Sequence, residues 1–409
     1  MRRGGARGAS ILVVLALALS CGRRTSTHPV EVTFWQTWPV EAITPLAQRF
    51  EDANPGVHIV VTRLPREGAT DTLALAAQSG RPPDLVELTP EQTADFIDRG
   101  LLSDWSAGVA DLKPDVRGWE LCSLGDAMYG LPWLLRTRVL LWNRALFARA
   151  KLDTTRAPGT WDELRDAAAR IEKLGGGVHG FGLTDAPGER FVSFMTFAWG
   201  NGGELLSARL DSCRIDSPEN AEALEFLLSL APVSLVAGRD SLASEFERGR
   251  LGLWIADAGY AVEARRRDPS LPLGAALVPS PAEDHGTHAS TGTGTVLASF
   301  TRSRRKEDAL RFARYLGERQ NTLALAAALQ TVFPPHPGVE EAPEYRDRPE
   351  VRLIIRQLET AHFEPLLRDR NLMLGAVDSL VGDALAHRRS ARATVGLADS
   401  LIRKLGVTR

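Results

Sequence analysis

The sequence predicts an α/β protein in which parallel strands form a sheet that helices cover on its faces. Strand-like and helix-like segments alternate from residue 30 to residue 88, and parallel strands need such crossover helices to connect them. The chain has 409 residues, of which 44% are hydrophobic and 24% are charged, as in globular proteins. At roughly 100–200 residues per domain, this length allows two or three domains.

The first elements follow from hydrophobic periodicity and from turn residues. Residues 30–35 (VEVTFW) alternate in polarity and are rich in β-formers, so they predict a strand. Apolar residues then recur at helical spacing from Ala42 to Phe50, before the turn residues Asn54-Pro55-Gly56. Further along, the pattern predicts a strand at 57–62, an Ala/Leu-rich helix at 70–79 that Gly80 closes, and a third, largely apolar strand at 84–88.

The later elements are predicted in the same way. Thr160 is placed to cap a helix, and Glu163 lies three residues on, where a capping box has its acid. We therefore expect Trp161, inside this motif, to be structural. Residues 306–316 are amphipathic with helical spacing. Strands are predicted at 139–142, 251–255, 271–278 and 295–300, and the tail from 351 to 409 is predicted to be mostly helical, with a break at Pro365.

Residues 1–20 have the pattern of a secretory signal. Three arginines (Arg2, Arg3 and Arg7) precede an unbroken apolar run at 11–19. This run is too short to span about 30 Å of hydrocarbon as a mature helix. Removal of this segment would change the formal net charge from −2 to −5, because it carries three arginines and no acid.

The signal ends in the sequence LALSC (17–21), which resembles a bacterial lipoprotein cleavage box. The resemblance implies cleavage before Cys21 and diacylglycerol attachment to its sulfur. Several acyl chains on one cysteine make a durable anchor. We therefore expect residues 21–29 to be a lipid-anchored linker and the protein to lie outside the cytoplasm on a bacterial membrane, on its periplasmic or cell-surface side. The alternative is a plain signal peptide followed by a chance cysteine.

Charge and cysteine content exclude several classes of protein. The chain has 49 basic and 51 acidic residues, and this near balance argues against nucleic acid as a partner. Three cysteines are too few for a disulfide scaffold or a four-thiolate zinc site. With Cys21 lipidated, we expect Cys122 and Cys213 to be buried free thiols, with a disulfide between them as the alternative. We expect no metal and no cofactor.

Eight short segments follow one another in an order typical of one bacterial family. They are VEVTFWQTW (30–38), FEDANPGVHI (50–59), RPPDLVEL (81–88), YGLPW (129–133), LLWNRALFARAKLD (140–153), PGTWDEL (158–164), FERGRLGLWIADAGY (246–260) and TGTGTV (291–296). Together they resemble the extracellular solute-binding proteins of carbohydrate-uptake ABC transporters, the family of maltose-binding protein. Trp142-Asn143 stands where the family has a Tyr-Asn pair, and Leu88 stands where it often has an aromatic residue.

The resemblance implies a two-lobe, periplasmic-binding-protein-like fold of type II. Each lobe would be a mostly parallel sheet flanked by helices, and a hinge would join the lobes. We expect lobe 1 to comprise 30–137 plus 295–337, and lobe 2 to comprise 138–294 plus 338–409. The chain would cross between the lobes near 136–140, 291–297 and 334–338.

The implied function is that of the substrate-binding lipoprotein of an ABC importer. It would capture a sugar or oligosaccharide in the cleft between the lobes and deliver it to the permease, as a monomer and without chemistry. A sugar site needs aromatic planes for C–H faces and planar polar groups for hydroxyls. The predicted ligand-binding residues are Gln36, Thr37, Trp38, Glu87, Thr89, Trp133, Arg136, Thr137, Glu189, Phe191, Asp257, Tyr260 and Gly292, with Arg370 and Asn371 as weaker candidates.

Two other functions remain open from the sequence. Arg136, Arg138 and Arg190 suit bidentate hydrogen bonds to an anion, so a polyol phosphate or another anionic solute is one alternative, unless Arg138 pairs with a helix carboxylate. The other is a secreted glycoside hydrolase, because paired carboxylates are common in a chain with 51 acids. The chain has no Gly-x-Ser-x-Gly, no His-Glu-x-x-His and no phosphate-loop motif.

Overall fold

The computed structural model describes residues 29–367 and 370–406. The predicted signal at 1–20, the cleavage box, the lipidation site Cys21 and the linker up to residue 28 lie outside the described residues. Within the described ranges, no helix has both the length and the apolar character needed to cross a bilayer.

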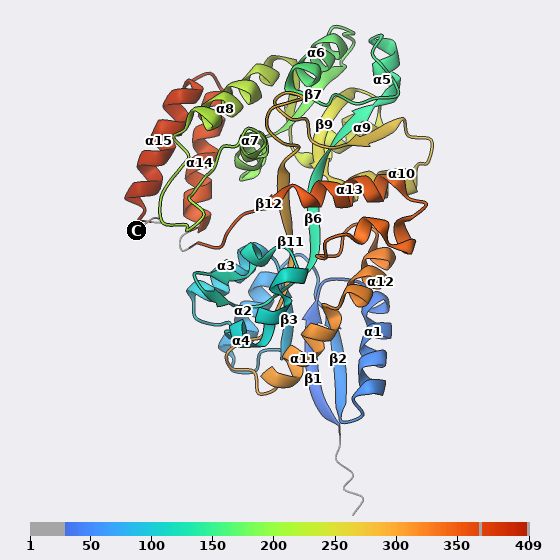
Figure 1. Ribbon diagram of the computed structural model, residues 1–409, viewed down its shortest axis with the longest axis vertical. Helices are drawn as coiled ribbons and strands as arrows, with labels where there is room; N and C mark the ends of the chain where they lie inside the picture. Colours follow the sequence, from blue (N-terminus) through green and yellow to red (C-terminus); the bar gives the residue numbers. More distant parts are fainter. Residues whose placement is uncertain (1–28, 368–369, 407–409) are drawn as a thin grey trace, which may run out of the picture.

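The described residues form two lobes that share one sheet (Figure 1). The strand order is β2-β1-β3-β11-β6-β9-β7-β8, with β10 also paired to β6 and β12 also paired to β11. The strands are β1 (Val30–Gln36), β2 (Val57–Arg63), β3 (Leu85–Leu88), β6 (Leu131–Asn143), β7 (His179–Thr184), β8 (Ser234–Ala237), β9 (Leu251–Asp257), β10 (Leu273–Ala276), β11 (Ser290–Ala298) and β12 (Ala361–Phe363); a small hairpin adds β4 (Ser123–Leu124) and β5 (Ala127–Met128).

Helices cover both faces of this sheet (Figure 1). The lower lobe carries α1 (Val40–Ala53), α2 (Ala69–Gln78), α3 (Pro90–Asp98), α4 (Ser106–Val109), α11 (Lys306–Leu316) and α12 (Arg319–Leu329). The upper lobe carries α5 (Arg144–Arg149), α6 (Trp161–Glu172), α7 (Glu189–Gly200), α8 (Pro218–Leu230), α9 (Arg239–Glu247), α10 (Ala258–Arg267), α14 (Arg370–Leu385) and α15 (Ala391–Lys404). Between the lobes runs α13 (Pro349–Glu359).

Strand β6 is common to both lobes. Up to Thr137 it pairs antiparallel with β11, and from Arg138 onward it pairs antiparallel with β9. The change of partner between these two residues is where the sheet passes from one lobe to the other. The lobe boundaries expected from the sequence stay a prediction, although β6 and β11 are the segments in which two of the expected crossings lie.

Each lobe has a hydrophobic core on both faces of its part of the sheet. Consecutive residues of a strand point to opposite faces, so Leu140 packs with one core of the upper lobe and Leu141 with the other. In the lower lobe, Leu85 and Val86 are divided between two cores in the same way. A sheet buried on both faces is typical of the parallel α/β class, which confirms the predicted fold class.

Several local predictions are confirmed and two are refined. The helix predicted at 306–316 is α11, and Cys122 and Cys213 are free, buried thiols. Thr160 caps α6 by accepting from the Glu163 N–H, but the Glu163 carboxylate accepts from the Gly159 N–H, so the capping box is not reciprocal. The strand predicted at 139–142 is part of the longer β6, whose apolar pattern is interrupted near its middle by Arg136 and Arg138.

Candidate functional site

A cavity of about 760 Å³ lies between the two lobes. This volume is within the range of about 300–1,000 Å³ that is usual for small-molecule sites. Its lower wall follows the carboxyl ends of β1, β2 and β3, where ligands bind in open α/β sheets. Its upper wall comes from β6, α7, α9, β9 and α14, and the alternating threonines and glycines of β11 (Thr291 to Thr295) line it between the two walls.

The lower wall is built around Glu87, at the end of β3. This residue is only 4% exposed. Its Oε2 accepts hydrogen bonds from the N–H of Thr37, at 2.8 Å, and from the Thr37 hydroxyl, at 3.0 Å. Its Oε1 has no partner within the described residues. Burial raises the pKa of Glu87, although the Thr37 hydrogen bonds act in the opposite direction.

Trp38 supplies an aromatic ring to the same wall. The indole is 5% exposed and is part of the core beneath the wall. The Arg66 guanidinium lies 4.7 Å from the ring centroid, which is a cation–π contact. Arg66 itself lines the cavity and follows β2, just as Thr37 follows β1.

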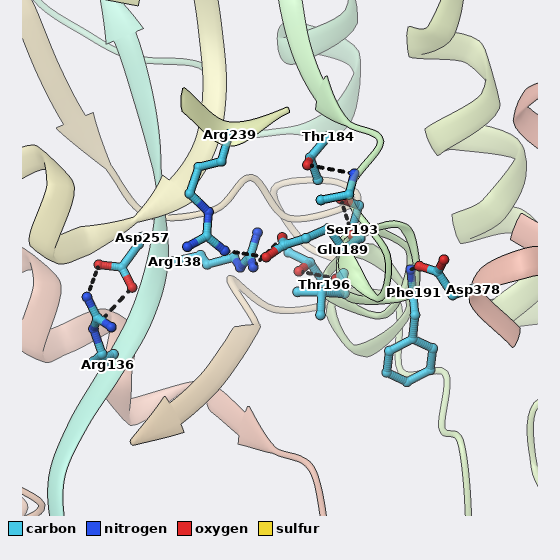
Figure 2. A network of polar contacts seen from close by, with 12 residues as sticks. Arg136, Arg138, Thr184, Glu189, Phe191, Ser193, Thr196, Arg239, Asp257 and Asp378 are labelled. Atoms are coloured by element: carbon cyan, nitrogen blue, oxygen red, sulfur yellow. Dashed lines mark hydrogen bonds and ion pairs between the residues drawn. The ribbon is translucent and has the colours of Figure 1, made fainter. Parts of the chain in front are cut away.

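The upper wall carries two ion-pair networks, shown in Figure 2. The Arg136 Nε lies 3.3 Å from Asp257 Oδ2. The Glu189 carboxylate accepts from Arg138 Nη2 at 2.6 Å and also pairs with Arg239. Burial alone would raise the pKa of Glu189, but the two arginines together lower it below its usual value. The Glu189 carboxylate is therefore ionised and already partnered, and Asp257 is paired with Arg136.

Asp378 of α14 holds the start of α7 in place (Figure 2). Helix α7 begins after Gly188, which has no side chain that could cap it. The Asp378 carboxylate instead accepts from the backbone N–H of Phe191 at 2.9 Å, and from Arg190 Nε and Nη2 at 3.1 and 2.8 Å. A residue distant in sequence thus caps the helix that presents Glu189 and Phe191 to the cavity.

Ten of the thirteen residues predicted from the sequence are brought together on the cavity wall. They are Thr37, Trp38, Glu87, Thr89, Arg136, Thr137, Glu189, Phe191, Asp257 and Gly292. Both weaker candidates, Arg370 and Asn371, also line it. Gly292 has a packing reason to lack a side chain, because a Cβ there would lie 2.5 Å from the Phe363 ring.

The structure places the other three predicted residues away from the cavity wall. Trp133 is fully buried in the lower-lobe core, edge-on to Phe34 with 5.9 Å between ring centroids. Gln36 is fully buried, and its Oε1 accepts from the backbone N–H of Trp38. Tyr260 packs against Trp254 and donates its hydroxyl to Glu247 at 3.1 Å. The structure therefore does not bring these three residues to the cavity: the first two side chains are buried in the lower lobe and the third is directed toward α9.

Some cavity residues were missed by the sequence prediction. Trp254 lines the cavity, whereas the prediction chose Tyr260 as the stacking aromatic of this segment. Arg66 had a usable signal, because it follows the carboxyl end of a predicted strand. Arg239 and Glu364 had none, since they reach the cavity only through the packing of the upper lobe.

The cavity lining has as many basic as acidic side chains. Its charged lining consists of five arginines (Arg66, Arg136, Arg138, Arg239 and Arg370) and five carboxylates (Glu87, Glu91, Glu189, Asp257 and Glu364). Arg370 pairs with Glu364, and burial raises the pKa of that carboxyl while Arg370 opposes the rise. Among the described residues, no cluster of His, Cys, Asp and Glu has the arrangement of a metal site.

Comparison with known proteins identifies one family. The family model for bacterial extracellular solute-binding proteins matches residues 37–322. A putative binding protein of Brucella abortus is 26% identical over 322 residues, which cover 75% of each chain. The diacetylchitobiose-binding protein DasA of Streptomyces coelicolor is 26% identical over 265 residues, 60% of this chain and 59% of that one. The solved structure of a cyclic α-maltosyl-1,6-maltose-binding protein from Arthrobacter globiformis is 24% identical, covers 92% and 99% of the two chains, and superposes with a TM-score of 0.82.

Proposed function

This chain belongs to the bacterial extracellular solute-binding proteins, and we propose that it captures a neutral sugar or oligosaccharide between its lobes and delivers it to the permease of an ABC importer. The observation that carries the proposal is the cavity: a space of about 760 Å³ with two tryptophans, paired arginines and many hydrogen-bonding side chains in its wall. Aromatic faces and planar polar groups are what the C–H faces and hydroxyls of a sugar require.

The pairing of the arginines favours a neutral solute over an anionic one. Arg136 pairs with Asp257, Arg138 with Glu189 and Arg190 with Asp378. An anion would have to compete with these carboxylates for the guanidinium groups, and it would meet their negative charge as well. A relative that binds diacetylchitobiose, a neutral disaccharide, supports the same solute class.

Capture would work by closure of the lobes without chemistry. Because both lobes contribute to the cavity wall, a ligand that touches both walls stabilises the closed form and shifts the population toward it. The ligand would be released unchanged to the permease. Monomeric action is part of this proposal.

A cavity-filling variant tests the function. Gly375 of α14 lines the cavity, and a Cβ at this position would meet no atom within 4 Å. Gly375→Trp should therefore place a large side chain in the cavity from a position where the added Cβ meets no packed atom. Maltose, maltotriose and diacetylchitobiose are tested by thermal shift, and the mixtures are then examined for hydrolysis products. We expect at least one of them to raise the melting temperature of the unmodified protein, with no product, and to have no effect on Gly375→Trp.

The matched control is Gly375→Ala, whose methyl group leaves most of the cavity volume free and which should still bind. Hydrolysis products formed by the unmodified protein would show that it is a hydrolase and would contradict the receptor function. An equal thermal shift in Gly375→Trp and the unmodified protein would place the binding site elsewhere.

We also propose that a lipid on Cys21 holds the protein at a bacterial membrane. The support is the sequence around this cysteine, together with the extracellular character of the family. Cys21→Ser should move the protein from the membrane pellet to the soluble fraction, because the sulfur that takes the lipid is absent. Recovery of this variant in the membrane pellet would contradict the anchor.

A further inference from the structure

One carboxylate oxygen in the cavity wall, Oε1 of Glu87, has no hydrogen-bond partner among the described residues. Glu87 is 4% exposed, and its Oε2 takes both hydrogen bonds from Thr37. A buried carboxylate oxygen without a donor is costly, and the cost falls on the ionised form of the group. The fixed position of Oε2 also means that the carboxyl group cannot rotate without losing the Thr37 bonds.

Few groups around Glu87 offset the cost of burying its negative charge. After β1, Thr37 donates to Oε2, and the Trp38 side chain also acts on the carboxyl group as a hydrogen-bond donor. Both groups lower the pKa of Glu87, and neither is charged. On the other side, β11 presents Leu297 opposite Glu87 in the register. Arg66, at the end of β2, is the cation that acts on Glu87, and Glu91 at the start of α3 is the acid on the same wall. Arg66 is exposed and stacked on Trp38, so its effect is weaker than that of burial, and the pKa of Glu87 is raised.

Two groups could satisfy Oε1. In the empty cavity a proton on Oε1 removes the buried charge. In the filled cavity a ligand hydroxyl can donate to Oε1, which stabilises the ionised carboxylate because hydrogen bonds to charged groups are the stronger ones. Glu87 is therefore favoured in its protonated form when the cavity is empty, and in its ionised form when a ligand is bound.

We propose that Glu87 exchanges its proton for a hydroxyl of the solute, so that capture of the solute releases a proton to the solvent. The proton on Oε1 passes to water, the solute O–H donates to the vacated oxygen, and no covalent bond of the solute changes. This inference rests on the proposed function, since it requires a hydroxyl group of that solute to donate a hydrogen bond to Glu87.

The sign of the pH dependence follows from linkage. Free protein binds more protons than the complex between the two pKa values of Glu87, so the affinity rises with pH through this range and is constant above it. For one exchanged proton, the affinity changes by at most about tenfold per pH unit.

The experiment has two measurements. Infrared spectra of the ligand-free protein, recorded across the acidic to neutral range, should show the C=O stretch of a buried protonated carboxyl that is absent from Glu87→Gln. Calorimetric titration with maltose, maltotriose and diacetylchitobiose in buffers of different ionisation enthalpy should show proton release by the unmodified protein and none by Glu87→Gln. Glutamine keeps the shape and an acceptor for Thr37, so the fold is expected to survive.

The control is Asp383→Asn, which removes a surface carboxylate that does not line the cavity and should leave both saccharide binding and proton release unchanged. Glu364→Gln tests the other cavity carboxyl with a raised pKa, and proton release that is lost in this variant but kept in Glu87→Gln would assign the proton to Glu364. Proton release that persists in Glu87→Gln, or a ligand-free protein without the Glu87 carboxyl band, would overturn the proposal. A Glu87 band combined with no binding of any of the saccharides would contradict the proposed function and leave the protonated state of Glu87 intact.

Discussion

Replacing Asp378 by alanine is expected to lower the free energy of unfolding by about 2 kcal/mol, because the buried backbone N–H of Phe191 and the half-buried guanidinium of Arg190 both lose their acceptor. The carboxylate is 4% exposed and makes three hydrogen bonds, two to Arg190 and one to the backbone N–H of Phe191. Its loss also removes the cap of α7. Since that helix presents Glu189 to the cavity, solute affinity should fall as well. The fall should exceed what the smaller folded fraction accounts for.

This result is measured by denaturant unfolding and by titration with whichever saccharide binds the unmodified protein. Asp383→Ala is the matched control, because Asp383 lies on the same helix and pairs with Arg388 and Arg389 at the surface. Exposed pairs of this kind contribute about 0–1 kcal/mol. Equal effects of the two substitutions would show that Asp378 does not hold α7.

Trp133→Ala is the substitution with the largest expected effect on stability, about 4 kcal/mol, as for other fully buried tryptophans cut back to a methyl group. The side chain is completely buried among lower-lobe residues and lies edge-on to Phe34. The sequence analysis counted Trp133 among the ligand-binding residues, and in that position its loss would weaken binding and leave the fold intact. With the ring in the core, the fold should suffer, and the dissociation constant of the folded fraction should stay near that of the unmodified protein.

Denaturant unfolding and saccharide titration below the melting temperature separate the two outcomes. Trp133→Phe is the control, because it keeps an aromatic ring against Phe34 and should recover most of the lost stability. If Trp133→Ala had normal stability and bound solute weakly, Trp133 would be a ligand-binding residue and the core assignment would be wrong.

Much of the site could be predicted because of where strands end. Thr37 and Trp38 follow β1, while Glu87 and Thr89 lie at the end of β3, and the carboxyl ends of neighbouring parallel strands meet at one edge of a sheet. The same rule would have found Arg66 after β2. It fails for β6, a strand that continues from one lobe into the other, since position along such a strand does not tell which side chains face the cavity and which face a core.

The sequence by itself determined the α/β class, most of the strands and helices of the lower lobe, the family and the chemical character of the cavity wall. These depend on periodicity and on residue type within short segments, which are local properties. Only the tertiary structure decided which side chains reach the cavity and in what state. It placed Trp133 in a core, matched the arginines at 136, 138 and 190 with carboxylates, and left one oxygen of Glu87 without a partner. The physical reason is that burial and ion pairing join residues far apart in the chain, as Arg190 and Asp378 are, and no local pattern encodes those distances.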